Sequence, residues 1–367
     1  ASKTVAGRVY VAANNYRNDD FANYLWHSED DGKTWRVITG DLPSDRVLRT
    51  LREDPRNPSV LWLGTELGVW WSWNGAENWV ELEGGLPTLA VNDVVIHPRD
   101  NDLVLATHGR GIWILDQVNA LQEMTPAIAE SASHLFTIGP AEQIRYRGDR
   151  GHTGNMIFEG ENPPAGAIID YWLGSAGGEV SITVHDATGA EVSSVRATSR
   201  RGMNRTVWNL HHATPGGGFG GGPWVVPGLY TVRLAVGDEV HRQSLRVSED
   251  PRIDVDPLVR RQWTEMLLDL GEAVSEARGL SREIAQVARR LDAENDPLVL
   301  GAQLEAKVRD LEREAQELGG RLARLSGSAQ GWIGPLSADQ TSQRAFLTEM
   351  LQTLRTEWSA ASQRLPG

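Results

Sequence analysis

The spacing of apolar residues changes twice along the chain. Up to Val118, short apolar runs are separated by polar, glycine-bearing turns, a pattern typical of β-strands joined by tight turns. From 135 to 249, apolar and polar residues alternate at a period of two, which predicts antiparallel strands. From Asp256 the period becomes helical. The sequence therefore predicts a mainly β chain with a C-terminal α-helical bundle.

The first region contains a repeat. Its clearest copies are "DPRNPSVLWLGTELGVWWS" (54–72) and "HPRDNDLVLATHGRGIWIL" (97–115), which align without a gap at an offset of 97 − 54 = 43 residues. An imperfect copy precedes them, "GRVYVAANNY" and "YLWHS", with an insertion around 17–23. A period of about 40–45 residues with several strands is the signature of a β-propeller blade. We predict a partial propeller of about two and a half blades over residues 1–118, fewer than the roughly 4–8 blades of a closed ring.

A polar turn, "SEDDGKTW", joins two strands of the first copy. Its distinctive positions are Ser28, Asp30, Gly32, Thr34 and Trp35. An Asp side chain can accept backbone N–H bonds across such a turn, Gly can adopt positive φ, and Trp can pack between blades.

The second copy carries an altered form of this turn, "SWNGAENW" (72–79). It keeps Ser72 and Trp79, and Asn74 replaces the Asp, with Ala76 and Asn78 in place of the Gly and Thr. Because the repeat tolerates these changes, we predict a structural role for the turn and no catalytic role for Asp30.

The motif resembles the Asp-box, or BNR repeat, of sialidases, two-propeller xyloglucanases and the sortilin family, where it is a fold-stabilising hairpin. The string "HGRGIWILD" (108–116) and the modules after it resemble the C-terminal portion of large exported bacterial proteins with sortilin-like propellers. The resemblance implies an exported protein, periplasmic or extrinsic to a membrane. A fainter whole-chain resemblance is to the extrinsic subunit of a bacterial photosystem reaction centre, which implies a membrane-bound photosynthetic complex as partner.

Two modules follow a connector at 119–134. The segments "VHDATGAEV", "GMNRTVWNL" and "VPGLYTVRL" predict a β-sandwich over 135–250 and resemble the immunoglobulin-like module of flagellar hook-capping proteins. Within it, "PGGGFGGGPW" (215–224) is a Gly tract with no phosphate-loop signature.

Residues 251–367 are expected to form an antiparallel three-helix bundle. Asp256-Pro257 and Asp296-Pro297 are typical helix starts. A heptad seam follows the second start: Leu304, Val308, Leu311, Ala315, Leu318, Leu322 and Leu325.

Composition excludes several functions. A net charge of −13 argues against a nucleic-acid surface, and no apolar stretch approaches the length of a transmembrane segment. The absence of cysteine excludes disulfides and thiolate metal sites. The first strand, Val9–Ala13, begins almost at once with no leader before it, which we interpret as a processed or truncated start.

No arrangement of residues predicts an enzyme, a cofactor or a metal site. Arg110, Arg145 and Tyr146 do not match a sialidase pattern, and His108 occupies a turn where the neighbouring copy has Thr65. His211-His212 has no metal-ligand spacing. Asp19, Asp20, Asp30 and Asp31 fit no calcium loop.

Two hypotheses follow. The first is a non-catalytic extrinsic scaffold that contacts other protein subunits, with Trp71, Trp73 and Arg110 as candidate contacts, because eight Trp residues concentrate before residue 118. The alternative is the C-terminal region of a larger exported Asp-box glycoside hydrolase, or of a protein that binds glycans or peptides. The first also predicts that the incomplete propeller leaves an apolar sheet face uncovered.

Overall fold

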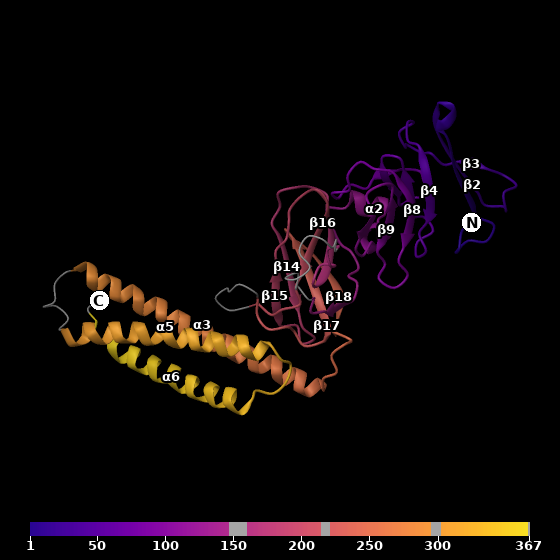
Figure 1. The fold of residues 1–367 in the computed structure, drawn as a ribbon. Helices are drawn as coiled ribbons and strands as arrows, with labels where there is room; N and C mark the ends of the chain where they lie inside the picture. The colour runs from indigo at the N-terminus through magenta and orange to yellow at the C-terminus, as the bar shows by residue number, and fades with distance from the viewer. Residues whose placement is uncertain (147–159, 214–220, 295–301, 366–367) are drawn as a thin grey trace.

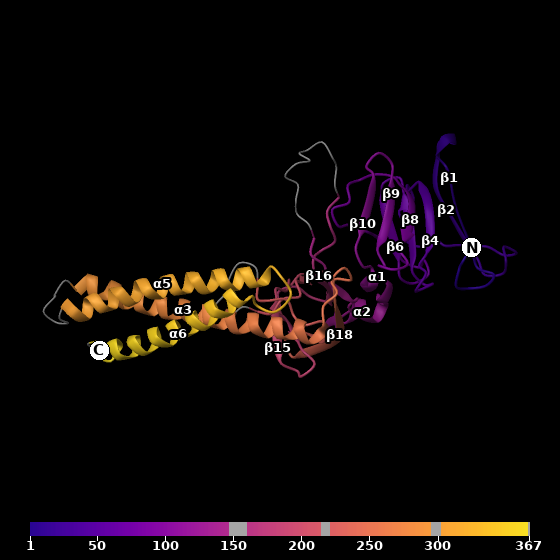
Figure 2. The same ribbon diagram turned by 60° about the horizontal axis from the view of Figure 1, so that its bottom comes forward.

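The computed structural model describes residues 1–146, 160–213, 221–294 and 302–365. The chain is mainly β, with several sheets and a helical C-terminal region. Its parts follow one another along an elongated molecule (Figures 1 and 2), with the N-terminal sheets at one end, the sheets of residues 133–249 in the middle and the long helices at the other end.

Three antiparallel sheets make up the N-terminal part, each built from strands consecutive in sequence. Sheet 1 contains β1 (Val9–Asn15), β2 (Asp20–Ser28) and β3 (Arg36–Val37). Sheet 2 contains β4 (Leu48–Glu53), β5 (Leu61–Thr65), β6 (Gly68–Ser72) and β7 (Val80–Glu81). Sheet 3 contains β8 (Val91–Ile96), β9 (Leu103–Thr107) and β10 (Ile112–Leu115). A short 3₁₀ helix, Tyr16–Asn18, lies in the insertion of the first copy.

The three sheets pack face to face in sequence order, and sheet 2 lies in the middle. One core joins sheets 1 and 2 and includes Leu25, Ile38, Leu61, Leu63, Trp70 and Trp79. A second core joins sheets 2 and 3 and includes Trp62, Val69, Trp71, Leu103 and Leu105. Side chains of a strand alternate between its two faces, so the run from Leu61 to Leu63 supplies both cores. This explains why β5 and β6 are buried along their whole length.

The gapless alignment of the second and third copies is wrong within the strands. Thr65 Oγ1 donates to Gly68 O (3.0 Å) across the turn of sheet 2, and Thr107 Oγ1 donates to Gly111 O (2.6 Å) in sheet 3. Thr107, not His108, is therefore the counterpart of Thr65. The turn before β9 is one residue shorter than the turn before β5, and the stretch from the threonine to the glycine is one residue longer, so matching residues of β5 and β9 are 42 positions apart.

The segment after sheet 3 is partly helical, with α1 (Asn119–Glu123) and α2 (Pro126–Glu130). Gln122 of α1 donates through Nε2 to Asp54 Oδ2 (2.8 Å) and to Asn101 Oδ1 (3.0 Å). Trp62 Nε1 donates to the same Asp54 oxygen (3.0 Å). These four buried side chains tie α1 to sheets 2 and 3.

The middle part has two sheets that share one core. The first contains β11 (Ser133–Leu135), β13 (Ala167–Leu173) and β16 (Gly202–Trp208). The second contains β12 (Ala141–Gln143), β14 (Val180–His185), β15 (Glu191–Val195), β17 (Gly228–Val236) and β18 (Glu239–Glu249). Residues of both sheets, such as Tyr171, Trp208 and Leu234, are buried between them. Most of the predicted Gly tract (215–224) lies outside the described residues.

Three long helices follow: α3 (Pro257–Glu294), α5 (Ala302–Gln330) and α6 (Ala338–Ser362). Asp256 accepts from the backbone N–H of Leu258 (2.8 Å), as expected for the cap before α3, whereas Asp296-Pro297 lies outside the described residues. The predicted seam of α5 from Leu304 to Leu325 is buried, in a core shared with α3 and α6.

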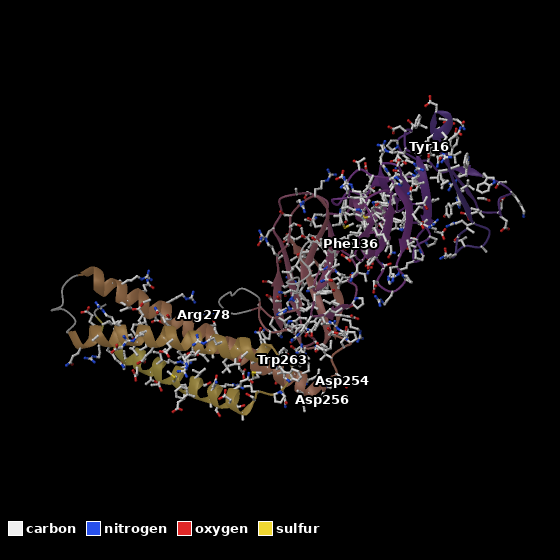
Figure 3. All side chains as sticks on the ribbon, viewed as in Figure 1. Tyr16, Phe136, Asp254, Asp256, Trp263 and Arg278 are labelled. Atoms are coloured by element: carbon white, nitrogen blue, oxygen red, sulfur yellow. The ribbon has the colours of Figure 1, made fainter. Side chains whose placement is uncertain are left out.

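A buried arginine joins α3 to the middle sheets. Arg260 is 2% exposed; its Nε donates to Glu249 (2.6 Å) and its Nη2 donates to Gln143 Oε1 (2.9 Å) and Val225 O (2.9 Å). Its guanidinium also lies over the ring of Trp263, labelled in Figure 3. Such a paired, desolvated cation fixes the start of the helix on the sheets.

Candidate functional site

The turn at 28–35 is held by its own side chains. Asp30 Oδ1 accepts from Thr34 N (2.8 Å) and Ser28 Oγ (2.8 Å), and Asp30 Oδ2 accepts from Thr34 Oγ1 (2.7 Å). Ser28 Oγ in turn accepts from Gly32 N (2.9 Å), where φ is +84°. These bonds, with Thr34 N first, hold the pKa of the Asp30 carboxyl below its usual value. The side-chain oxygens of Ser28, Asp30 and Thr34 are thus all hydrogen-bonded within the turn.

The turn at 72–79 repeats this geometry with different residues. Asn74 Oδ1 accepts from Asn78 N (3.0 Å) and Ser72 Oγ (3.0 Å), and Ser72 Oγ accepts from Ala76 N (2.9 Å). Ala76 adopts φ of +74°, the region that glycine takes in the first turn. The amide oxygen of Asn74 therefore accepts the same two hydrogen bonds as Asp30 Oδ1.

The two turns differ in what covers their tryptophan. Trp79 is 4% exposed, because Ile38 and Leu42 of the first copy pack against it. Trp35 is 44% exposed, so the expectation that it packs between two blades is wrong for this chain. Its indole lies against Gly32 and donates to Gly32 O (3.0 Å). One side of Trp35 borders a hollow of about 370 Å³ that is also lined by Val11 and Trp26.

We call the outer surface of sheet 1 the front face and define it as Val11, Trp26, Trp35 and Val37. Val11 pairs with Trp26, and Trp26 pairs with Val37, in one row across the sheet. The matching residues of sheet 2 are Leu63 and Trp70, which are buried against sheet 1. The front face of sheet 1 therefore corresponds to the surface of sheet 2 that sheet 1 covers, but no sheet covers the front face in the described part of the chain.

The outer surface of sheet 3 is also open. We call it the rear face and define it as Val95, Val104, Ile112 and Ile114, which pair with one another across the three strands as Val95–Val104–Ile114, with Ile112 beside them. Ile112 is 70% exposed and Ile114 is 60% exposed. Their counterparts in sheet 2, Val69 and Trp71, are buried against sheet 3.

The predicted partner contacts lie mostly elsewhere. Trp71 is buried in the core between sheets 2 and 3, and its ring contacts the rings of Trp62 and Trp73. Trp73 is half-buried against the same core. Arg110 lies exposed in the turn between β9 and β10. The tryptophan density of the repeat suggested contacts with a partner, but Trp71 and Trp73 belong to the core, and the uncovered residues were missed because exposure depends on which sheet is terminal.

A groove of about 770 Å³ runs along the first strands of the three sheets. Its polar lining includes Tyr10, Arg49, Arg52, Glu53 and Arg56. Tyr10 Oη donates to Glu53 Oε2 (2.9 Å), Arg52 pairs with Asp93 (2.6 Å), and Arg49 pairs with Glu66. Arg49 and Arg52 are thus neutralised by neighbouring carboxylates.

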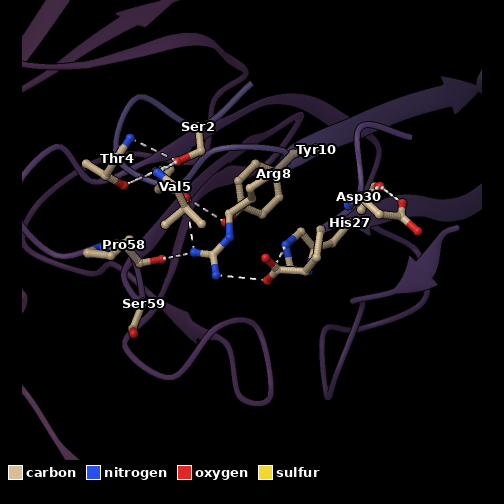
Figure 4. A network of polar contacts seen from close by, with 12 residues as sticks. Ser2, Thr4, Val5, Arg8, Tyr10, His27, Asp30, Pro58 and Ser59 are labelled. Carbon is tan, nitrogen blue, oxygen red and sulfur yellow. Dashed lines mark hydrogen bonds and ion pairs between the residues drawn. The ribbon is translucent and has the colours of Figure 1, made fainter. Parts of the chain in front are cut away.

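The Tyr10–Glu53 pair belongs to a network that joins sheets 1 and 2, and Figure 4 shows the part of it around Ser2, Thr4, Arg8 and Pro58. Arg8 donates to Glu29 (2.8 Å), to Glu53 (3.4 Å) and to Pro58 O (3.4 Å), while Ser2 Oγ donates to Glu53 Oε1 (2.5 Å). Burial, followed by the bond to Glu53, raises the pKa of Tyr10. Burial raises the pKa of Glu53, but bonds from Ser2, Tyr10, Thr4 and Arg8 outweigh it and lower that pKa. The pair therefore holds a neutral phenol against a carboxylate.

Other sequence candidates are not assembled into a site. Among the described residues, no contact joins Arg110 to Arg145 or Tyr146; Arg145 instead lies over the ring of Trp224. His211 Nδ1 bonds to Gly222 O (2.7 Å), and burial lowers its pKa. No group of three His, Asp or Glu side chains in the described part of the chain is placed to hold a metal ion. Within the same ranges, no helix has the length and apolar character needed to cross a bilayer.

No protein-family model matches the sequence, and no curated protein matches it significantly. Among solved structures, an ancestral GH74 enzyme matches weakly, with 12% identity and a TM-score of 0.25 over 66% of this chain and 30% of that one. The BSP domain of a biofilm-associated protein has 10% identity and a TM-score of 0.18 over 52% of this chain and 27% of that one. The chain thus spans less than a third of either structure.

Proposed function

We propose that the protein is a non-catalytic, exported interaction protein that binds another polypeptide through the open faces of a partial Asp-box propeller. The observation that carries this proposal is the front face. Its row of Val11 and Trp26 corresponds to Leu63 and Trp70, which are buried by a neighbouring sheet. Exposed apolar surfaces of this kind mark binding sites, and aromatic side chains commonly dominate the energetics of protein interfaces.

The polar groups near the sheets support a binding role over a catalytic one. The oxygens of Asp30 accept bonds from within its own turn, and Glu53 accepts from four side chains. A general base must be free to take a proton from a substrate. Carboxylates engaged in this way stabilise the fold instead.

The elongated layout also suits a scaffold. The buried Arg260 junction fixes the helical region to the middle sheets, which places the helices and the front face at opposite ends of the molecule (Figure 1). A partner bound at the front face would leave the helices accessible to a second partner.

Co-purification with the tagged full chain from detergent-solubilised cells tests the proposal. We expect a stoichiometric partner that is lost when the front face carries Val11→Arg. A matched control is Leu229→Arg, at an exposed apolar position of β17 far from the front face. Equal partner recovery with all three chains, or a wild-type chain that recovers no protein and is also monomeric, would contradict the proposal.

A second candidate function is glycan binding or hydrolysis. The observation that favours it is the groove that Tyr10, Glu53 and three arginines line, because ligand sites are concave and place a few polar groups toward the ligand. Glycan binding or hydrolysis that disappears in Tyr10→Phe, with unfolding unchanged, would favour this function. Loss of partner binding in Val11→Arg alone would favour the first.

A further inference from the structure

We propose that the partner of the front face is the rear face of a second copy of this chain. The inference rests on the proposed function, because it names the occupant of the same open face. Front-to-rear contact is already the way in which sheets 1, 2 and 3 associate within one chain. A second copy would continue that established packing.

The internal interfaces show what a front face accepts. The front surface of sheet 2, with Leu63 and Trp70, is covered by Leu25, Ile38 and Leu42 of the first copy of the repeat. These three side chains are aliphatic, and Tyr10 of the same surface adds a hydrogen bond to Glu53 (2.9 Å). The front face of sheet 1 offers a similar surface, with Val11 and Trp26 in the matching row.

The rear face carries the matching cover. Leu25, Val69 and Ile112 occupy the same position, each next to the tryptophan of its sheet, in β2, β6 and β10. Leu25 and Val69 are 0% exposed because a following sheet lies on them, whereas Ile112 is 70% exposed. Val95, Val104 and Ile114 extend this surface with further aliphatic side chains, and Asp93, in the row of Ile112, is paired with Arg52 (2.6 Å). One chain therefore holds both halves of the interface, at opposite ends of its three sheets.

Two copies can cover the front face and the rear face of each chain at the same time. Strand β1 contacts β4 and β4 contacts β8, so the sheets meet along their first strands, as in the radial arrangement of a propeller. A front-to-rear contact joins two different surfaces, and such contacts either close into a ring or continue as a filament. Two arcs of three sheets related by a twofold axis would form two such junctions and a ring of six sheets. Rings of roughly 4–8 sheets are typical of propellers.

The molar mass of the full chain in solution, measured by light scattering over a concentration series, tests this inference. We expect a dimer for the wild type and for Leu229→Arg. Both Val11→Arg, on the front face, and Ile112→Arg, on the rear face, are expected to be monomers with unchanged circular dichroism. Each variant lacks one half of every junction.

Mixing the two variants gives the sharpest result. The intact front face of Ile112→Arg can bind the intact rear face of Val11→Arg, so a 1:1 complex with one junction should form. A front-to-front dimer would instead be unaffected by Ile112→Arg and would not be restored by mixing, which would overturn the inference. A wild-type monomer at every soluble concentration would also overturn it.

The outcomes separate this inference from the proposed function. If the wild type is monomeric but Val11→Arg still abolishes co-purification of a different protein, the proposed function holds and the second copy is not the occupant. If neither mass nor co-purification responds to Val11→Arg, both fail.

Discussion

The turns at 28–35 and 72–79 bind the same backbone N–H groups but differ in how far their tryptophan is covered. In each, a Ser and an Asp or Asn bridge the turn through the same backbone N–H groups. Yet Trp79 is 4% exposed and Trp35 is 44% exposed. The motif therefore fixes the shape of the hairpin, whereas the neighbouring sheet decides whether its tryptophan is core or surface. Because sheet 1 is the terminal sheet, the tryptophan that is core in the second turn becomes a candidate contact for a partner in the first.

The largest expected difference is between the two tryptophans. Trp79→Ala should lower the free energy of unfolding by about 3–5 kcal/mol, because it empties a packed core site. Trp35→Ala should cost at most about 1 kcal/mol in the free chain, because its ring is partly in water. Urea unfolding of both variants, followed by circular dichroism, measures the two values. Similar losses would show that Trp35 is as well covered as Trp79.

The rear positions give a smaller contrast of the same kind. Leu25→Ala removes a fully buried side chain and should cost about 2–4 kcal/mol. Ile112→Ala, at the matching position of sheet 3, should change stability by less than about 0.5 kcal/mol in the monomer. The same unfolding series at low protein concentration measures both. A loss above 2 kcal/mol for Ile112→Ala in the monomer would mean that part of the chain covers the rear face.

Acid provides the smallest and most local contrast. The hydrogen bonds to Asp30 lower its folded pKa from the ordinary 3.8, so ionised Asp30 stabilises the turn above that value. This stabilisation is lost as the pH falls through the folded pKa. Asp30→Asn imitates the second turn and should therefore be less stable than the wild type near neutral pH, with the difference shrinking as the pH falls below 3.8. Thermal unfolding across this pH range measures it.

Asn74→Asp is the converse control. It should give the second turn an acid-dependent contribution that the wild-type turn lacks, since an amide does not titrate. If the difference between Asp30→Asn and the wild type did not vary with pH, the carboxylate bonds would not be the source of the turn's stability.

Local patterns predicted a large part of this fold. Apolar runs between glycine-bearing turns indicated the first β region, period-two alternation indicated the second, and the helical seam from Leu304 to Leu325 indicated residues that are buried. The turn chemistry of Asp30 was legible because its partners lie within four residues of it. Such features depend on short stretches of chain.

The features that the sequence left hidden depend on distant segments. The one-residue shift between β5 and β9 escaped notice because compensating changes in the two flanking turns restore the 43-residue offset. Tyr10 and Glu53, which are 43 positions apart in the sequence, join two strands of different sheets. The exposure of Trp35 and Ile112 follows from the order of the sheets, which no local pattern contains.

Hydroxyl-radical footprinting of the full chain tests the central claim most directly. In dilute protein, Trp35 and Ile112 should be oxidised several times faster than their buried counterparts Trp79 and Val69, after correction for intrinsic reactivity. At concentrations where copies associate, Trp35 and Ile112 should become protected together, while Trp79 and Val69 do not change. Equal protection of all four residues in the dilute monomer would contradict the account, because the two faces would then be covered within a single chain.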